Sequence, residues 1–284
     1  MKISIGTNYF GENLRQSLAR QTHSIIQQKH KNVLMYNVQF ADELNSNNPD
    51  KTIKNLHVLT RSSKDVLPNF SKKLPFVKDI FNALADTDCD VFVFINSDIL
   101  ITDNLINYIK NVQLLSTTCQ RLDIDPISDL SDIITGRRFE IAGFDAFIFN
   151  KNWYITHQVL FEDFLLGRVY FDHAFALIMK IFGGENIILN SFPPNIVHIM
   201  HGRESHTEDQ GNLYNKNIYE NSFAKNLFYI WDEFVHKFLI HRNPSGSFLN
   251  CLENEKLIEK EYFSNMIKKE YSEIQTIKSK FNLI

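Results

Sequence analysis

This 284-residue chain has few of the features that mark secreted or membrane-spanning proteins. Its three cysteines, Cys89, Cys119 and Cys251, are far apart in the sequence, so they predict no disulfide framework and fit a reducing compartment. No apolar run is long enough to cross a membrane, and no signal peptide precedes the strand-like N-terminal sequence MKISIG. We therefore expect a cytoplasmic protein, with at most a peripheral contact at the inner face of the membrane.

The chain also has no large excess of charge of one sign and few glycines. The 30 basic and 33 acidic side chains are interspersed and leave a net charge of -3, which argues against nucleic acid as a partner. The only glycines near the N-terminus are Gly6 and Gly11, so the chain lacks the glycine-rich phosphate loop expected of a nucleotidyltransferase. Apolar residues are plentiful: 44% of the chain is hydrophobic and 24 residues are Phe, which is enough for a large core, although they could also mark a sticky surface.

The N-terminal part has the element order of a doubly wound α/β sheet. Apolar runs predict the strands, apolar residues at helical spacing predict the helices, and a polar turn, Gly6-Thr7-Asn8, is expected after the first strand. The predicted elements are strands at 2–5, 33–40, 56–59 and 91–95, and helices at 14–28 and 75–85.

Three small polar residues, Asn96, Ser97 and Asp98, directly follow the predicted buried strand Val91–Ile95. Open α/β sheets bind their ligands at the carboxyl ends of the strands. Cations that carry phosphates take oxygen ligands, and one or two carboxylates suffice because some water is retained. Asp98 is therefore a candidate metal ligand, although a strand that simply ends in a polar turn explains the pattern equally well.

Two further acids lie in apolar surroundings. Asp145 interrupts the strand-like run Phe139–Phe149, and because a buried unpaired carboxylate costs several kcal/mol, it should cap a turn or face a polar cleft. Asp172 opens a predicted helix, where it is either an N-cap stabilised by the helix dipole or a general base. Residues 123–134 contain four aspartates without the spacing or the glycine of an EF-hand, and predict a solvated loop.

Histidines are concentrated around a predicted edge strand, Ile196–Met200. His198, His201 and His206 lie within nine residues of a chain that has 10 histidines. Neutral imidazole is a good ligand for transition metals, so at least one of them is a candidate for contact with a metal or a phosphate. The alternative is that one of these histidines is packed in the core and the other two lie on the surface without a ligand.

In order along the chain, the segments NSDI, GFDAFIF, GRVYFDHAF and HIMHGRESH resemble a group of nucleotide-sugar glycosyltransferase-like proteins with the GT-A fold, found in bacteria and plants. The resemblance covers residues 1–206. It implies an α/β, Rossmann-like mixed sheet flanked by helices. The chain departs from the usual D-x-D metal motif at its first acid, where it has Asn96, which is a poorer metal ligand.

The resemblance implies transfer of a sugar from a UDP- or GDP-sugar to a hydroxyl of a glycan or glycoconjugate. Asp98, with His198 and His201, would hold a divalent cation, Mn²⁺ or Mg²⁺, at the leaving diphosphate. Asp172 would be the base of a direct, inverting displacement, and Asp145 would position the acceptor. For Lys78 a solvated helix face is the alternative to a donor contact. The residues expected to contact the donor are polar or basic: Gly6, Thr7, Asn8, Lys78, Asn96, Ser97, Arg168 and Arg203.

The chain is expected to divide into a catalytic domain at 1–210 and a helical extension at 211–284. Residues 211–220 are polar and predict a linker, and helices are predicted at 223–240 and 252–281. We expect the extension to pack on the catalytic domain. The alternatives are a homodimer contact or a membrane-facing surface, and the acids among its lysines argue against strong electrostatic binding to a membrane.

Two other functions fit the same residues. A metal-dependent phosphohydrolase or nucleotidyltransferase would use Asp98 and the histidines, and a non-catalytic interaction protein would keep a degenerate site, which Asn96 allows. Ligand binding distinguishes these three functions. A glycosyltransferase should bind nucleotide sugars with metal, a phosphohydrolase or nucleotidyltransferase should bind only metal and free nucleotide, and an interaction protein should bind neither.

Overall fold

The computed structural model describes residues 1–10, 13–43, 52–111, 116–133, 138–183, 194–201, 209–222, 225, 227, 265 and 271–283. The strands are β1 Ile3–Thr7, β2 Val33–Phe40, β3 Lys54–Leu59, β4 Val91–Ile95, β5 Ile99–Ile101, β6 Ser116–Ile124, β7 Arg138–Asn150 and β8 Ile196–Ile199. The α-helices are α1 Leu14–Lys29, α2 Ser63–Val66, α3 Val77–Ala85, α4 Asp103–Asn111, α5 Lys151–His157, α6 Phe171–Ile178, α7 Gln210–Asn221 and α10 Tyr271–Lys280. Short 3-10 helices span Leu130–Ile133 and Gln158–Leu160, and a π-helical turn spans Met179–Gly183.

The described strands form one mixed sheet in the order β3-β2-β1-β4-β7-β6-β8-β5. β1 pairs in parallel with β2 and β4, and β2 pairs in parallel with β3, which confirms the doubly wound order predicted for the N-terminal part. β7 runs antiparallel to β4 and β6, whereas β8 is parallel to β6 and antiparallel to β5. The carboxyl ends of β1 and β4 therefore lie at one edge of the sheet, the edge where ligands are expected.

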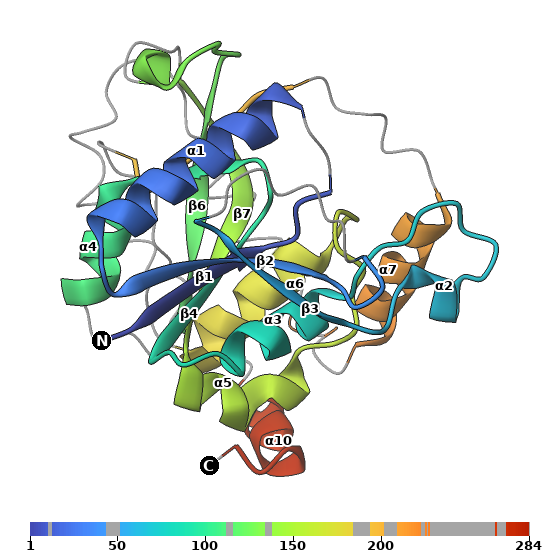
Figure 1. Cartoon of the computed structure of the whole chain (residues 1–284). Helices are drawn as coiled ribbons and strands as arrows, with labels where there is room; N and C mark the ends of the chain where they lie inside the picture. The colour runs from blue at the N-terminus through green and yellow to red at the C-terminus, as the bar shows by residue number, and fades with distance from the viewer. Residues whose placement is uncertain are drawn as a thin grey trace.

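Helices cover both faces of this sheet (Figure 1). Alternate side chains of β4 point to opposite faces: Phe92 and Phe94 pack with α3, α5 and α6, while Val91, Val93 and Ile95 pack with α4 and the end of α1. Phe81 of α3 is the centre of an aromatic cluster on the first face. Its ring lies 4.8 Å from that of Phe149, centroid to centroid. Much of the high Phe content therefore builds the core.

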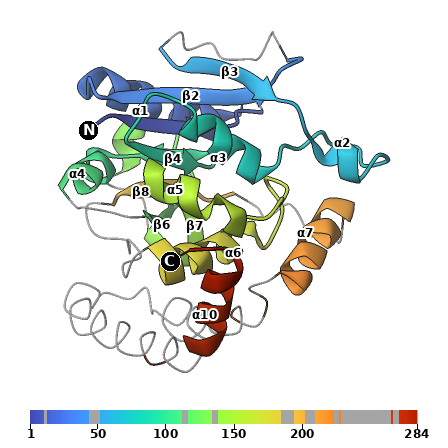
Figure 2. The same ribbon diagram turned by 90° about the horizontal axis from the view of Figure 1, so that it is seen from below.

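The C-terminal part contains a helix where the sequence predicts a linker. Residues 211–220 belong to α7, which begins at the N-cap Asp209; its side chain accepts a hydrogen bond from the backbone N–H of Asn212 at 2.8 Å. The linker prediction is wrong because it rested on the polarity of these residues and did not include the N-cap at Asp209, which starts a helix. In α10, Ile274 and Ile277 are buried in the same cluster as residues of α5 and α6, so this helix packs on the helices that cover the sheet (Figure 2).

Most of the predicted helices 223–240 and 252–281 lies outside the described residues, and the domain boundary at 210 stays a prediction. Among the helices that are described, none has both the length and the apolarity needed to cross a membrane.

Two other local predictions are wrong. Gly6 and Thr7 are the last residues of β1 and not part of a turn. A Cβ atom on Gly6 would lie 2.3 Å from Cδ2 of Leu84, so the glycine permits close packing of α3 on β1. β8 is not an edge strand, because it pairs with β6 on one side and β5 on the other.

Candidate functional site

Strand pairing brings three segments that are distant in the sequence to one place. Asp98 lies in the short turn between β4 and β5. His198, on β8, is paired directly with Ile99 of β5 on one side and with Asp123 of β6 on the other. The side chains of Asp98, His198 and Asp123 therefore meet, although up to 100 residues separate them along the chain.

Asp98, His198 and His201 have the arrangement of a cation site. Oδ2 of Asp98 lies 3.5 Å from Nε2 of His198 and 3.7 Å from Nε2 of His201. One ligand atom from each of the three lies within 4.8 Å of the others, and this is the group of possible metal ligands found in the described part of the chain. Ligands bound at about 2.1 Å to one ion are separated by roughly 3–3.5 Å, so the spacing fits a divalent cation.

The charges around this cluster favour a cation between the carboxylates. Burial alone would lower the pKa of His198, but its hydrogen bond to Asp123 and its interaction with Asp98 outweigh this and raise the pKa to about 9. Burial alone would raise the pKa of Asp98, but the interaction with His198 outweighs it and lowers the pKa. The imidazolium of His198 balances the charge of these carboxylates, and it has to release its Nε2 proton before it can bind a metal ion.

Helix α1 holds the turn that carries Asp98. Nε2 of Gln16 donates to Oγ of Ser97 at 3.1 Å, and the backbone N–H of Ile101 donates to Oγ1 of Thr22 at 3.2 Å. Between them, Nε2 of the buried His23 hydrogen-bonds the carbonyl oxygen of Ile99 at 2.9 Å, which makes Nε2 the protonated nitrogen. Nδ1 of His23 then accepts a hydrogen bond from the hydroxyl of Tyr9.

Acid should destabilise the protein through His23. Burial is the main reason that the pKa of this imidazole is lowered from 6.5 to about 4. The hydrogen bond to Ile99 raises the pKa, and the charge of Arg20 lowers it further. Its contribution to the free energy of unfolding is therefore complete above pH 6.5 and is lost as the pH falls toward 4, because only the unfolded state binds the proton in that window. We expect a loss of about 2–3 kcal/mol between pH 7 and 4.5, measured by urea unfolding.

His23→Gln is the control, because glutamine keeps a donor for Ile99 but does not titrate. His198 acts in the opposite direction, because its raised pKa makes its contribution to stability increase as the pH falls through about 6.5. This contribution is present in the wild type and in His23→Gln alike, so it cancels in the comparison. The same pH slope in the wild type and in His23→Gln would show that His23 is not the group responsible.

Asp145 occupies a β-bulge that turns it toward the same cluster. The pairing of β6 with β7 shifts here, with Cys119 opposite Ala146 and Gln120 opposite Phe144, so Asp145 has no partner in the ladder. Bulges re-aim side chains and are common beside active sites. The carboxylate accepts a hydrogen bond from Nη1 of Arg121 at 2.8 Å and another from Nδ2 of Asn96. Asp145 is thus a buried carboxylate with two polar partners, and the polar cleft predicted for it stays a prediction.

The side-chain amide of Asn96 donates its hydrogen bond to Asp145, and Asn96 is not one of the three candidate metal ligands. Restoring the usual metal motif with Asn96→Asp would place two carboxylates in contact and remove a donor. We expect the free energy of unfolding to fall by about 1–3 kcal/mol, with no gain in cation affinity. The Asn96→Asp/Asp145→Asn double variant restores a donor–acceptor pair and should recover stability in urea unfolding. A stable single variant that binds cations more tightly would contradict this account.

Asp172 lies in the first turn of α6. Its side chain is 27% exposed, and Oδ2 lies 3.9 Å from Nε2 of His173. The ring of His173 packs edge-on against Phe144, the residue before Asp145. The N-cap position of α6 is Tyr170, in a left-handed conformation with φ of 80° and no side-chain cap, so Asp172 is not the N-cap. The general-base prediction for Asp172 stays a prediction.

The residues at the end of β1 are buried. The side chain of Asn8 donates to the carbonyl oxygen of Val38 at 2.7 Å and so helps to join β1 to β2. Oγ1 of Thr7 and Oε1 of Gln16 are buried without a hydrogen-bond partner among the described residues. Buried polar atoms normally have a partner, so these two atoms are exceptions at this edge of the sheet.

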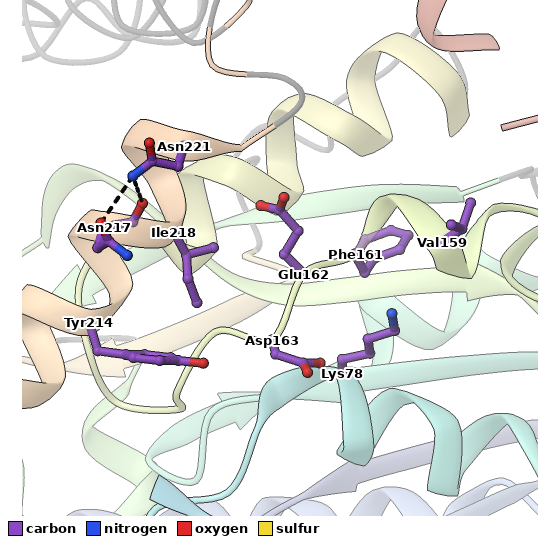
Figure 3. Close-up of a pocket in the computed structure, with 9 residues that line it drawn as sticks. All are labelled: Lys78, Val159, Phe161, Glu162, Asp163, Tyr214, Asn217, Ile218 and Asn221. Carbon is purple, nitrogen blue, oxygen red and sulfur yellow. Dashed lines mark hydrogen bonds between the residues drawn. The ribbon is translucent and has the colours of Figure 1, made fainter. Parts of the chain in front are cut away.

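Lys78 and Arg168 lie elsewhere. Lys78 lines an open groove of about 480 Å³ between α3, Tyr214 and its neighbours on α7, and the segment around Asp163 (Figure 3), and no residue of the Asp98 cluster lines it. Nη2 of Arg168 lies 3.0 Å from Oδ2 of Asp209, the N-cap of α7, and its guanidinium lies over the ring of Phe70. Arg203 and His206 lie outside the described residues.

The site residues predicted from the sequence do not include two members of the cluster, Asp123 and Arg121. The solvated loop predicted for residues 123–134 is wrong at Asp123: this residue lies in β6, its side chain is fully buried, and Oδ1 is 2.5 Å from Nδ1 of His198. Arg121 bridges Asp123 and Asp145, and both carboxylates raise the pKa of its guanidinium against the effect of burial. Leu122 and Ile124 on either side continue the strand pattern, a signal that could have placed Asp123 in β6.

No protein-family model and no curated protein matches this sequence. Among solved structures, the fold is similar to that of S. aureus TarS, residues 1–349, in complex with UDP-GlcNAc. The TM-score is 0.50 at 10% sequence identity, and the match covers 96% of this chain and 73% of that one. The glycosyltransferase GlyE of Streptococcus pneumoniae TIGR4 matches more loosely, with a TM-score of 0.39 at 8% identity, over 82% of this chain and 63% of GlyE. The chain has the GT-A fold, which confirms the mixed, helix-flanked α/β sheet implied by the sequence resemblance.

Proposed function

We propose that this chain is a glycosyltransferase that moves a sugar from a nucleotide-diphosphate sugar to a hydroxyl of a glycan or glycoconjugate. One observation carries the proposal: Asp98, His198 and His201 converge at the carboxyl end of β4, at the ligand-binding edge of a GT-A sheet. The similar TarS structure holds UDP-GlcNAc, a donor of this class.

The three side chains would bind one divalent cation. Two imidazoles beside one carboxylate favour Mn²⁺ over Mg²⁺, because magnesium prefers oxygen ligands and imidazole binds transition metals. When bound, the cation would supply positive charge to the leaving diphosphate. The buried Oγ1 of Thr7 and Oε1 of Gln16 would hydrogen-bond the donor from the neighbouring strand end.

Asp172 would act on the acceptor. The acceptor oxygen attacks the anomeric carbon of the donor, the bond from that carbon to the diphosphate oxygen breaks, and the hydroxyl proton passes to the carboxylate of Asp172. Asp145, held by Arg121 and Asn96, would accept a hydrogen bond from the acceptor sugar and orient it. A direct displacement of this kind inverts the anomeric centre.

A thermal-shift panel tests the proposal, because a ligand that binds only the native state raises the melting temperature. The panel contains UDP- and GDP-sugars, free UDP and GDP, and each of these with Mn²⁺ or Mg²⁺. We expect the largest shift from one nucleotide sugar together with Mn²⁺. A response to metal and free nucleotide alone would favour a phosphohydrolase or nucleotidyltransferase, and no response would favour a non-catalytic protein.

A further inference from the structure

We propose that Asp123 is a positioning residue of the cation site, which fixes the ring of His198 so that Nε2, and not Nδ1, faces Asp98. This inference rests on the cation site of the proposed function. It assigns a role to a carboxylate on β6, a strand that carries none of the three candidate ligands.

The first support is the hydrogen bond between β6 and β8. Asp123 and His198 are direct partners in this pairing, and Oδ1 of Asp123 lies 2.5 Å from Nδ1 of His198. An ionised carboxylate can only accept, so Nδ1 carries a proton. In the neutral ring, the lone pair is then on Nε2, the atom 3.5 Å from Asp98.

The second support is that Asp123 is itself immobilised. Its side chain is fully buried, and Nε of Arg121 lies 3.2 Å from Oδ1. Arg121 is anchored in turn on Asp145 through Nη1. Asp123 is therefore shielded from solvent and held by both Arg121 and His198. Partners that fix a metal-binding histidine in this manner typically change metal affinity by about 10–100-fold when they are removed.

A simple charge effect must be separated from positioning. A carboxylate near a cation attracts it whether or not His198 is present, whereas positioning acts only through His198. A double-mutant cycle distinguishes the two, because it measures whether the effects of the two substitutions are independent.

The test is calorimetric titration of Mn²⁺, without donor or acceptor, into the wild type, Asp123→Asn, His198→Ala and the double variant. We expect Asp123→Asn to weaken Mn²⁺ binding about 10–100-fold in the wild-type background and not at all in the His198→Ala background. Unchanged affinity in Asp123→Asn, or the same loss in both backgrounds, would overturn the positioning role while leaving the cation site in place. A wild type that binds no Mn²⁺ would overturn both.

Asp125→Asn is the matched control, since it removes an acid two residues further along that does not contact His198, and it should bind Mn²⁺ like the wild type. If Asp123→Asn fails to fold, the nitrogen chemical shifts of His198 in the Zn²⁺-loaded wild type give a second measurement. Zinc is diamagnetic and binds imidazole well. The proposal predicts a protonated Nδ1 and a metal-bound Nε2, and the reverse assignment would overturn it.

Discussion

Asp98→Ala is expected to abolish donor binding and to lower sugar transfer by at least about 10³-fold. The substitution removes the only carboxylate of the candidate ligand set and leaves His198 and His201 alone at the site. Loss of the cation removes several kcal/mol of charge stabilisation from the leaving diphosphate, and each 1.4 kcal/mol is roughly tenfold in rate. Calorimetric titration with the nucleotide sugar and a product assay would measure the two effects.

Asp129→Ala is the control for this variant. Asp129 is exposed in the loop after β6 and is not a candidate ligand, so its removal should leave donor affinity and transfer at the wild-type level. Wild-type donor affinity in Asp98→Ala would remove Asp98 from the site, and with it the proposed mode of donor binding.

Asp172→Asn should retain donor and cation binding but lose transfer by about 10²–10⁴-fold, the usual contribution of a positioned general base. Asparagine keeps the size of the side chain and cannot accept the proton. The loss should appear in kcat and not in the KM for the donor.

A purely structural role for Asp172 predicts a different result. Removing a negative charge from the first turn of α6 costs about 0.3–1 kcal/mol in stability. Asp172→Asn would then melt at a lower temperature and still transfer sugar. Full turnover by the variant would rule out Asp172 as the base.

The fold was predictable where the pattern was local. The run Val91–Ile95 has one face of Phe and one of β-branched residues, and it is a central strand with those two faces packed on different helices. Errors occurred where a distant segment decided the outcome. β8 reads as an edge strand in isolation, but β5 and β6 pair on its two sides. Likewise, the sequence around Gly6 predicts a turn, but the glycine lies in β1, where the close approach of the Leu84 side chain leaves no space for a Cβ atom.

The site was predictable in part for the same reason. Asp98, His198 and His201 are conspicuous by residue type and lie together as expected of a shared site, although their role is a proposal. Asp123 and Arg121 were missed because their importance comes from pairing across β6, β7 and β8, which no local pattern contains. The bulge at Asp145 is a property of two strands at once, so the sequence predicted a polar environment for this acid but not the partners that supply it.

The central claim is that Asp98, His198 and His201 bind a cation that also contacts the diphosphate of the donor. Electron-nuclear double resonance on Mn²⁺ added to the protein with a UDP- or GDP-sugar tests this directly. The account predicts hyperfine coupling of the same ion to imidazole nitrogen, lost in the His198→Ala/His201→Ala double variant, and to phosphorus of the nucleotide. Phosphorus coupling without nitrogen coupling, or nitrogen coupling that survives in the double variant, would contradict it.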